Sequence, residues 1–100
     1  MSAQREGKRR YLRLRAAVSE AVNRADPVGL LEIGAPSDEY DPEVGTVLPR
    51  LREAKSPGDV ARILHEEFVR WFGSEQAGDV EAYRKPATEI WRVLESEGPL

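Results

Sequence analysis

The strongest structural constraint in this 100-residue chain is a helical pattern in residues 57–73. Ser56 can cap the first turn, Pro57 suits the first helical position, and Asp59 follows the serine by three residues, as in a capping box. Apolar residues then recur every three or four positions, which is the spacing of one helix face. These residues are Val60, Ile63, Leu64, Phe68, Trp71 and Phe72. Gly73 is expected to end the helix.

The same spacing predicts a helix over residues 8–25 and another over residues 79–96. The first of these should stop at Asp26, because a residue that precedes proline is disfavoured in helical geometry. Pro86 should kink the other helix or separate its first turn. The inward faces are predicted to be Tyr11, Leu14, Val18, Ala21, Val22 and Ala25 in the first helix, and Val80, Tyr83, Ala87, Ile90, Trp91 and Leu94 in the second.

Residues 41–55 predict one more helix, with Asp41 as its cap and Pro42 at its first position. Pro49 should kink or interrupt this helix, because an interior proline costs about 3 kcal/mol. Its buried face is predicted to be Val44, Val47, Leu48 and Leu51. The four helices together indicate an all-α fold, a small bundle in one domain spanning residues 1–100, with residues 1–7 disordered. The centre of the core is predicted to be Val60, Ile63, Leu64, Phe68, Trp71, Ile90, Trp91 and Leu94.

A long connection joins the helices 8–25 and 41–55, and it carries the densest acidic cluster of the chain. Connections of about fifteen residues are uncommon in compact domains and are often functional. Its apolar residues, which are Val28, Leu30, Leu31 and Ile33, should cover one end of the bundle. The acidic cluster is Asp38, Glu39, Asp41 and Glu43. It can stabilise a helix N-terminus, bind a protein or hold a divalent cation, and the spacing does not fit a twelve-residue calcium loop. A partner contact is predicted at Asp38, Glu39, Tyr40 and Asp41.

The charge is unevenly distributed, with about +5 in residues 1–15 and −8 in the remainder, for a net charge of −3. Arg5, Arg9 and Arg13 recur every four residues and form one basic stripe on the expected first helix. Positive charge opposes the dipole at a helix start, so this stripe is either an anion contact or part of a frayed terminus.

Residues that could support catalysis are few. The chain has no cysteine and one histidine, His65, which excludes thiolate chemistry and sites with two histidines. Glu66 and Glu67 are adjacent, so on a helix they point about 100° apart and cannot share a substrate. Glu66 is expected to pair with Arg70, and His65 to lie at the edge of the core. No catalytic, metal or cofactor site is predicted.

Three groups of residues resemble a family of small bacterial helical proteins of unknown function, the YugE-like family. They are Asp26-Pro27-Val28-Gly29, then Asp38-Glu39-Tyr40-Asp41, and finally Tyr83 and Ala87 leading into Ile90-Trp91. The resemblance covers residues 26–95 and implies an all-helical fold, without an activity to carry over. In size and charge alone the chain also resembles immunity proteins that neutralise toxins.

The sequence therefore predicts a non-enzymatic protein-interaction module without a cofactor, and an immunity or antitoxin role is its concrete form. The alternative is a nucleic-acid-associated protein that uses the basic first helix, although the net negative charge opposes this function. No apolar run approaches the roughly 18–20 residues of a membrane span, and no secretory signal is expected. We expect a cytoplasmic protein that is a monomer or a weak homodimer and binds a protein partner.

Overall fold

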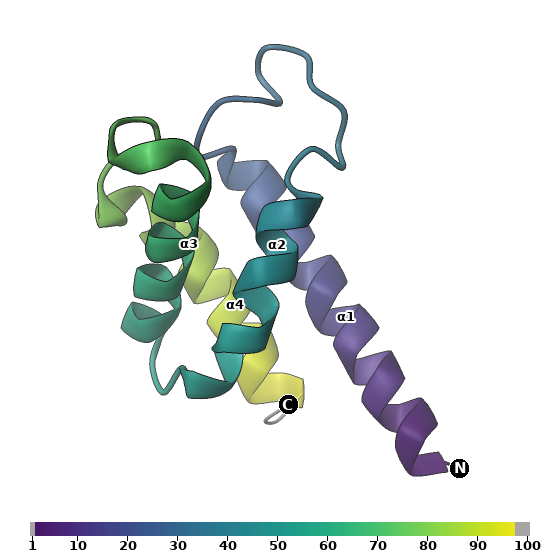
Figure 1. The fold of residues 1–100 in the computed structure, drawn as a ribbon. Coiled ribbons are helices and arrows are strands. Elements are labelled where there is room, and N and C mark those ends of the chain that lie inside the picture. Colours follow the sequence, from purple (N-terminus) through teal and green to yellow (C-terminus); the bar gives the residue numbers. More distant parts are fainter. Residues whose placement is uncertain (1, 98–100) are drawn as a thin grey trace.

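The computed structural model describes the backbone of residues 2–97 and the side chains of residues 7–97. Every regular element in this range is helical, which confirms the all-α prediction (Figure 1). The elements are α1 (Ser2–Ala25), α2 (Asp41–Val47), the 3₁₀ helix η1 (Leu48–Glu53), α3 (Pro57–Ala77), the 3₁₀ helix η2 (Val80–Tyr83) and α4 (Arg84–Glu97).

Helix α1 begins earlier than the sequence predicts and ends where predicted. It starts at Ser2 instead of near Lys8, so residues 2–7, which were expected to be disordered, continue the helix. The straight-chain residues of this segment have high helix propensity. Met1 lies outside the described residues. After Ala25 the chain turns at Asp26, which has a φ of 44° and donates its backbone N–H to the Val22 carbonyl at 2.8 Å.

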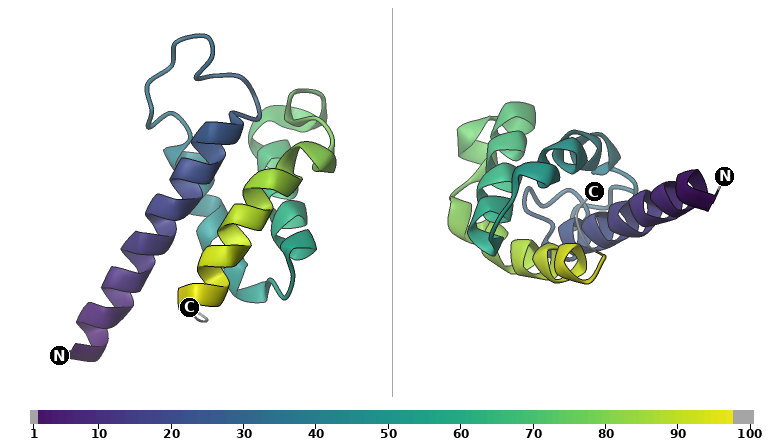
Figure 2. Two further views of the ribbon diagram at one scale, coloured as in Figure 1. Left: turned by 180° about the vertical axis from the view of Figure 1, so that it is seen from behind. Right: turned by 90° about the horizontal axis from the view of Figure 1, so that it is seen from below.

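Helix α4 lies between α1 and α3 and packs against both, while α2 contacts α1 and α3 (Figure 2). The N-terminal turns of α1 extend beyond the other helices and give the molecule its length, with principal extents of 44 × 28 × 19 Å (Figure 1). The long connection between α1 and α2 lies at the opposite end of α1.

The core contains most of the side chains that the helical spacing predicts. Val60, Ile63, Leu64, Phe68 and Ile90 are fully buried, and so is the predicted face Val44, Val47, Leu48 and Leu51. Three assignments to the centre are wrong, because Trp91 and Leu94 are only partly buried and Trp71 is 47% exposed. Tyr11 and Ala25, which were predicted to face inward, are exposed. Tyr11 lies one turn before Leu14, where burial begins in the described part of α1.

Both interior prolines stand at helix starts, where a missing N–H costs little. Pro49 lies in the first turn of η1, so the predicted break is confirmed and follows Val47. Pro86 lies in the first turn of α4, and η2 is the separated turn before it. The predicted cap of α2 is wrong by one residue, since Tyr40 occupies the N-cap position without a side-chain hydrogen bond.

Helix α3 starts as its capping pattern predicts. The Asp59 N–H donates to the Ser56 hydroxyl at 3.1 Å, and the Asp59 carboxylate accepts the N–H of Lys55 at 2.8 Å. Gly73 interrupts the helix with a φ of 85°, but helical turns resume and continue to Ala77. The first regular helix therefore ends at Gly73, as predicted, and a second short helical stretch within α3 runs on to Ala77.

Candidate protein-interaction site

The connection 26–40 is organised by one carboxylate and one phenol. The Tyr40 hydroxyl donates to Asp26 Oδ1 at 2.6 Å. The same carboxylate accepts the backbone N–H groups of Leu31 and Glu32, each at 3.0 Å. Burial alone would raise the pKa of Asp26, but these hydrogen bonds outweigh it and hold the pKa below its ordinary value of 3.8. The connection is thus closed by hydrogen bonds between side chains and backbone.

Tyr40 is buried, so the prediction that its ring contacts a partner is wrong. Its exposed fraction is 1%, and its ring packs against Phe68 with a centroid separation of 5.7 Å. The hydroxyl accepts the N–H groups of Val28 and Leu30 at 3.3 and 3.4 Å. Burial and the bond to Asp26 raise the pKa of Tyr40 to about 12. The ring is drawn inward because a phenol can fill the apolar end of the bundle and still satisfy its hydroxyl.

The apolar residues of the connection are divided between core and solvent. Val28, Leu30 and Leu31 are partly buried and pack against the core, as predicted. Ile33 is 81% exposed and does not join them. It precedes Gly34, whose φ of 99° forms a tight turn with the N–H groups of Gly34 and Ala35 bonded back to Leu31 and Leu30.

Asp38, Glu39 and Asp41, which we call the acidic segment, are all exposed. They flank the buried Tyr40, and within residues 7–97 no ion pair to their carboxylates is found. The structure therefore exposes three of the four predicted contact residues, two in the turn before α2 and one at its first residue.

Glu43 differs from the other acids of the predicted cluster because it is only 5% exposed. It is the third residue of α2. Its Oε2 atom is buried and has no hydrogen-bond partner among the described residues. Burial, followed by repulsion from Glu39 and Asp41, raises the pKa of Glu43 above its ordinary value of 4.5. No local sequence signal indicates this burial, which depends on α3 packing over α2.

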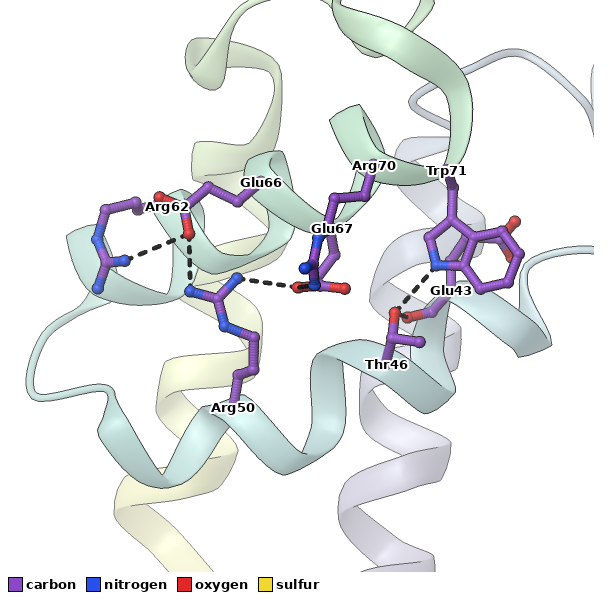
Figure 3. A network of polar contacts seen from close by, with 8 residues as sticks. All are labelled: Glu43, Thr46, Arg50, Arg62, Glu66, Glu67, Arg70 and Trp71. Carbon is purple, nitrogen blue, oxygen red and sulfur yellow. Dashed lines mark hydrogen bonds and ion pairs between the residues drawn. The ribbon is translucent and has the colours of Figure 1, made fainter.

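The exposed indole of Trp71 lies beside the same part of α2. Its Nε1–H donates to the Thr46 hydroxyl at 3.0 Å, and that hydroxyl donates to the Glu43 carbonyl at 3.0 Å (Figure 3). Phe68 fills the core below, so Trp71 lies at the rim, where the indole N–H has a polar partner. Sequence reasoning missed this position because helical spacing placed the indole in the core.

A network of ion pairs joins η1 to α3 next to Trp71 (Figure 3). Arg50 contacts Glu66 at 2.7 Å and Glu67 at 3.0 Å, while Arg70 contacts Glu67 at 3.4 Å. The predicted pair between Glu66 and Arg70 is therefore wrong, because Glu66 turns toward Arg50 and Arg62. The two glutamates differ in burial, since Glu67 is 2% exposed and Glu66 is exposed. Both carboxylates nevertheless reach the Arg50 guanidinium, so the prediction that they cannot share one group is wrong.

His65 lies at the edge of the core, as expected, with partial exposure. Its Nε2 lies 2.8 Å from the Gly78 carbonyl, and because a carbonyl only accepts, this nitrogen carries the proton. Its ring packs on Tyr83 with a centroid separation of 5.5 Å. Tyr83 in turn donates its hydroxyl to the Ala77 carbonyl at 2.7 Å. These contacts close the α3–η2 connection, which gives His65 a structural role.

The basic stripe of α1 is only partly available as an anion contact. Arg13 forms a bidentate pair with Glu97 of α4 at 2.8 and 2.9 Å, and this pair holds the pKa of the Glu97 carboxylate below its ordinary value of 4.5. Arg13 thus joins α1 to α4, and its guanidinium already has a carboxylate partner within the chain. Arg9 is exposed, and the side chain of Arg5 lies outside the described residues.

The described part of the chain contains no cluster of three or more His, Asp or Glu side chains arranged to hold a metal ion. None of its helices combines the length and the apolar character needed to cross a membrane.

The chain matches no protein-family model, and no curated protein or solved structure is significantly similar to it.

Proposed function

We propose that this protein is a non-enzymatic interaction module that binds a basic protein partner through Asp38, Glu39 and Asp41. The observation that supports this proposal is the exposure of three carboxylates on a segment fixed by the bond between Asp26 and Tyr40. A fixed segment loses little conformational entropy when it binds, and its clustered charge speeds the encounter with an oppositely charged surface.

Three titratable side chains form contacts that support the fold. His65 closes the α3–η2 connection, Glu67 pairs with Arg50, and Asp26 organises the long connection. These roles support a binding function in place of catalysis, and the proposal requires no cofactor. We infer action in the cytoplasm, where a chain without cysteine needs no oxidative folding.

An immunity or antitoxin role fits this chemistry. A toxin that acts on nucleic acid needs a basic surface, because its substrate is a polyanion. A small protein with a fixed acidic segment can cover such a surface, and steering by complementary charge makes that association fast and dependent on salt.

The test begins with affinity capture from native lysate, followed by rate measurements with the purified, identified partner. The triple variant Asp38→Asn, Glu39→Gln and Asp41→Asn should slow association by about tenfold or more at low salt and flatten its salt dependence.

The matched control neutralises three exposed acids elsewhere, Glu20→Gln, Glu53→Gln and Glu95→Gln. It removes the same charge and should slow association much less. Equal effects of the two triple variants would show that only net charge matters, and unchanged rates in both would move the interface away from the acidic segment.

A second candidate function is nucleic-acid binding by the N-terminal part of α1. Residues 7–13 are all exposed, they include Lys8, Arg9 and Arg10, and this end of α1 extends beyond the other helices (Figure 1). Fluorescence anisotropy with labelled single- and double-stranded oligonucleotides tests it. We expect weak binding that falls steeply with salt, and sub-micromolar affinity at physiological salt would place this function ahead of protein binding.

A further inference from the structure

Trp71 is an exposed aromatic side chain that is nevertheless held in position. It is 47% exposed, and its indole N–H is bonded to Thr46 at 3.0 Å (Figure 3). Interfaces are often anchored by tryptophan, because its large ring offers a partner much apolar area together with one N–H donor. Trp71 is therefore a large, exposed apolar side chain that a partner could cover.

Glu43 lies next to this indole and carries an unsatisfied oxygen. Both residues are bonded to the Thr46 hydroxyl, Trp71 through its indole and Glu43 through its carbonyl, and in Figure 3 the Glu43 side chain passes behind the ring. Glu43 is 5% exposed and its Oε2 has no hydrogen-bond partner among the described residues. Buried polar atoms nearly always have a partner, so an orphaned carboxylate oxygen indicates a donor that comes from outside.

The surrounding charges determine what kind of donor fits. The cations of the neighbouring network, Arg50 and Arg70, are engaged by Glu66 and Glu67. Glu39 and Asp41 are close enough to act electrostatically on Glu43 and add negative charge. The charge around the Glu43–Trp71 position is therefore negative, and a cationic group is the complementary occupant.

We propose that Trp71, Thr46 and Glu43 form a subsite for an arginine side chain of the basic partner, which makes the inference dependent on the proposed function. The indole turns from Thr46, the guanidinium stacks on the ring, and one N–H donates to Glu43 Oε2. Arginine fits better than lysine, because its planar group stacks on an indole while its N–H groups donate in a fixed fork.

The probe for this subsite is acetylated triarginine amide, compared with the same peptide made from citrulline, which keeps the shape but has no charge. The readout is the Trp71 indole N–H resonance, assigned by its loss in Trp71→Phe and followed in the full chain. We expect a saturable shift with triarginine, a several-fold weaker response to trilysine and none with tricitrulline.

Glu43→Gln is the decisive variant, because it keeps the shape of the buried side chain and removes its negative charge. It should weaken triarginine binding by about tenfold. Glu53→Gln, which neutralises an exposed acid of η1, should leave the affinity within about twofold. An unchanged affinity in Glu43→Gln, or no shift of the Trp71 resonance, overturns the subsite.

The triple variant of the acidic segment separates this inference from the proposed function. If it slows association with the partner while Glu43→Gln has no effect on triarginine, the proposed function stands and the subsite fails. If Trp71 responds to triarginine only when Glu43 is intact, the subsite stands, even where the triple variant leaves the partner's association rate unchanged. If the Trp71 resonance shifts with protein concentration in the absence of any probe, a second copy of the chain binds at this position. That result would overturn the proposal that the subsite binds an arginine of the partner.

Discussion

Removing the hydroxyl of Tyr40 should destabilise the fold by about 2–3 kcal/mol. In Tyr40→Phe the ring keeps its place against Phe68, so no cavity forms and the loss reports the hydroxyl alone. The bond to the Asp26 carboxylate, at 2.6 Å, is the main term, because a hydrogen bond to a charged group contributes about 1.5–3 kcal/mol. The long contacts from Val28 and Leu30, at 3.3 and 3.4 Å, add about 0.5 kcal/mol together.

The assay is urea unfolding followed by circular dichroism for the wild type, Tyr40→Phe, Asp26→Asn and the double variant. Asparagine tolerates the positive φ of residue 26, so Asp26→Asn removes the charge without adding backbone strain. The double-mutant cycle should give a coupling energy of about 1–2 kcal/mol between the two side chains. Hydrogen exchange should accelerate at the amides of Leu31 and Glu32, which donate to Asp26.

The pH dependence supplies an independent check on the same contact. The folded-state pKa of Asp26 is lowered, so its contribution to stability is present above the ordinary value of 3.8 and is lost as the pH falls through the folded pKa. The difference between wild type and Tyr40→Phe should therefore be largest near neutrality and shrink in acid. If Tyr40→Phe lowers the free energy of unfolding by less than about 0.5 kcal/mol at pH 7, or if the coupling energy is zero, the bond between Asp26 and Tyr40 does not stabilise the connection.

Three further predictions concern buried or half-buried groups. Phe68→Ala should cost about 3–5 kcal/mol, whereas Trp71→Ala should cost about 1 kcal/mol or less; equal losses in denaturant unfolding would contradict the observed burial. Glu67→Gln should cost about 1–3 kcal/mol in the same assay, because a buried carboxylate with two arginine contacts is lost, and an unchanged midpoint would show that the pairs contribute nothing. Glu43→Gln should stabilise the protein increasingly as the pH rises. Because the pKa of Glu43 is raised in the folded state, its contribution to stability is fully present below pH 4.5 and is lost as the pH rises through the folded pKa. A melting-temperature difference between wild type and Glu43→Gln that stays constant from pH 4 to pH 8 would exclude this account.

The helices could be predicted from the sequence because apolar spacing and capping residues act locally. The start of α3 at Ser56 and the interruptions near Pro49 and Pro86 follow from the chemistry of single residues. The early start of α1 could not be predicted from periodicity, since residues 2–7 carry no apolar stripe in the sequence.

The candidate site was predicted only in part, because burial there is decided by contacts between elements. Asp38, Glu39 and Asp41 are exposed to solvent, as expected for charged side chains. Tyr40 and Trp71 are both large aromatic residues with one polar atom, so the sequence does not distinguish them. In the structure Tyr40 is buried and Trp71 is exposed. Tyr40 is hydrogen-bonded to Asp26, fourteen residues away, and Trp71 is hydrogen-bonded to Thr46, twenty-five residues away. Neither pairing is visible in helical spacing.

The burial of Tyr40 and the exposure of its neighbours follow from one contact. Since the Tyr40 ring is drawn under the connection by Asp26 and Phe68, the adjacent Glu39 and Asp41 carboxylates lie on the solvent side. The acids themselves support little of the fold, because no ion pair ties them to other described residues. Under the proposed function, stability and recognition therefore depend on different residues of one short segment. Changes at Tyr40 should alter both stability and binding, whereas neutralising Glu39 should alter binding alone.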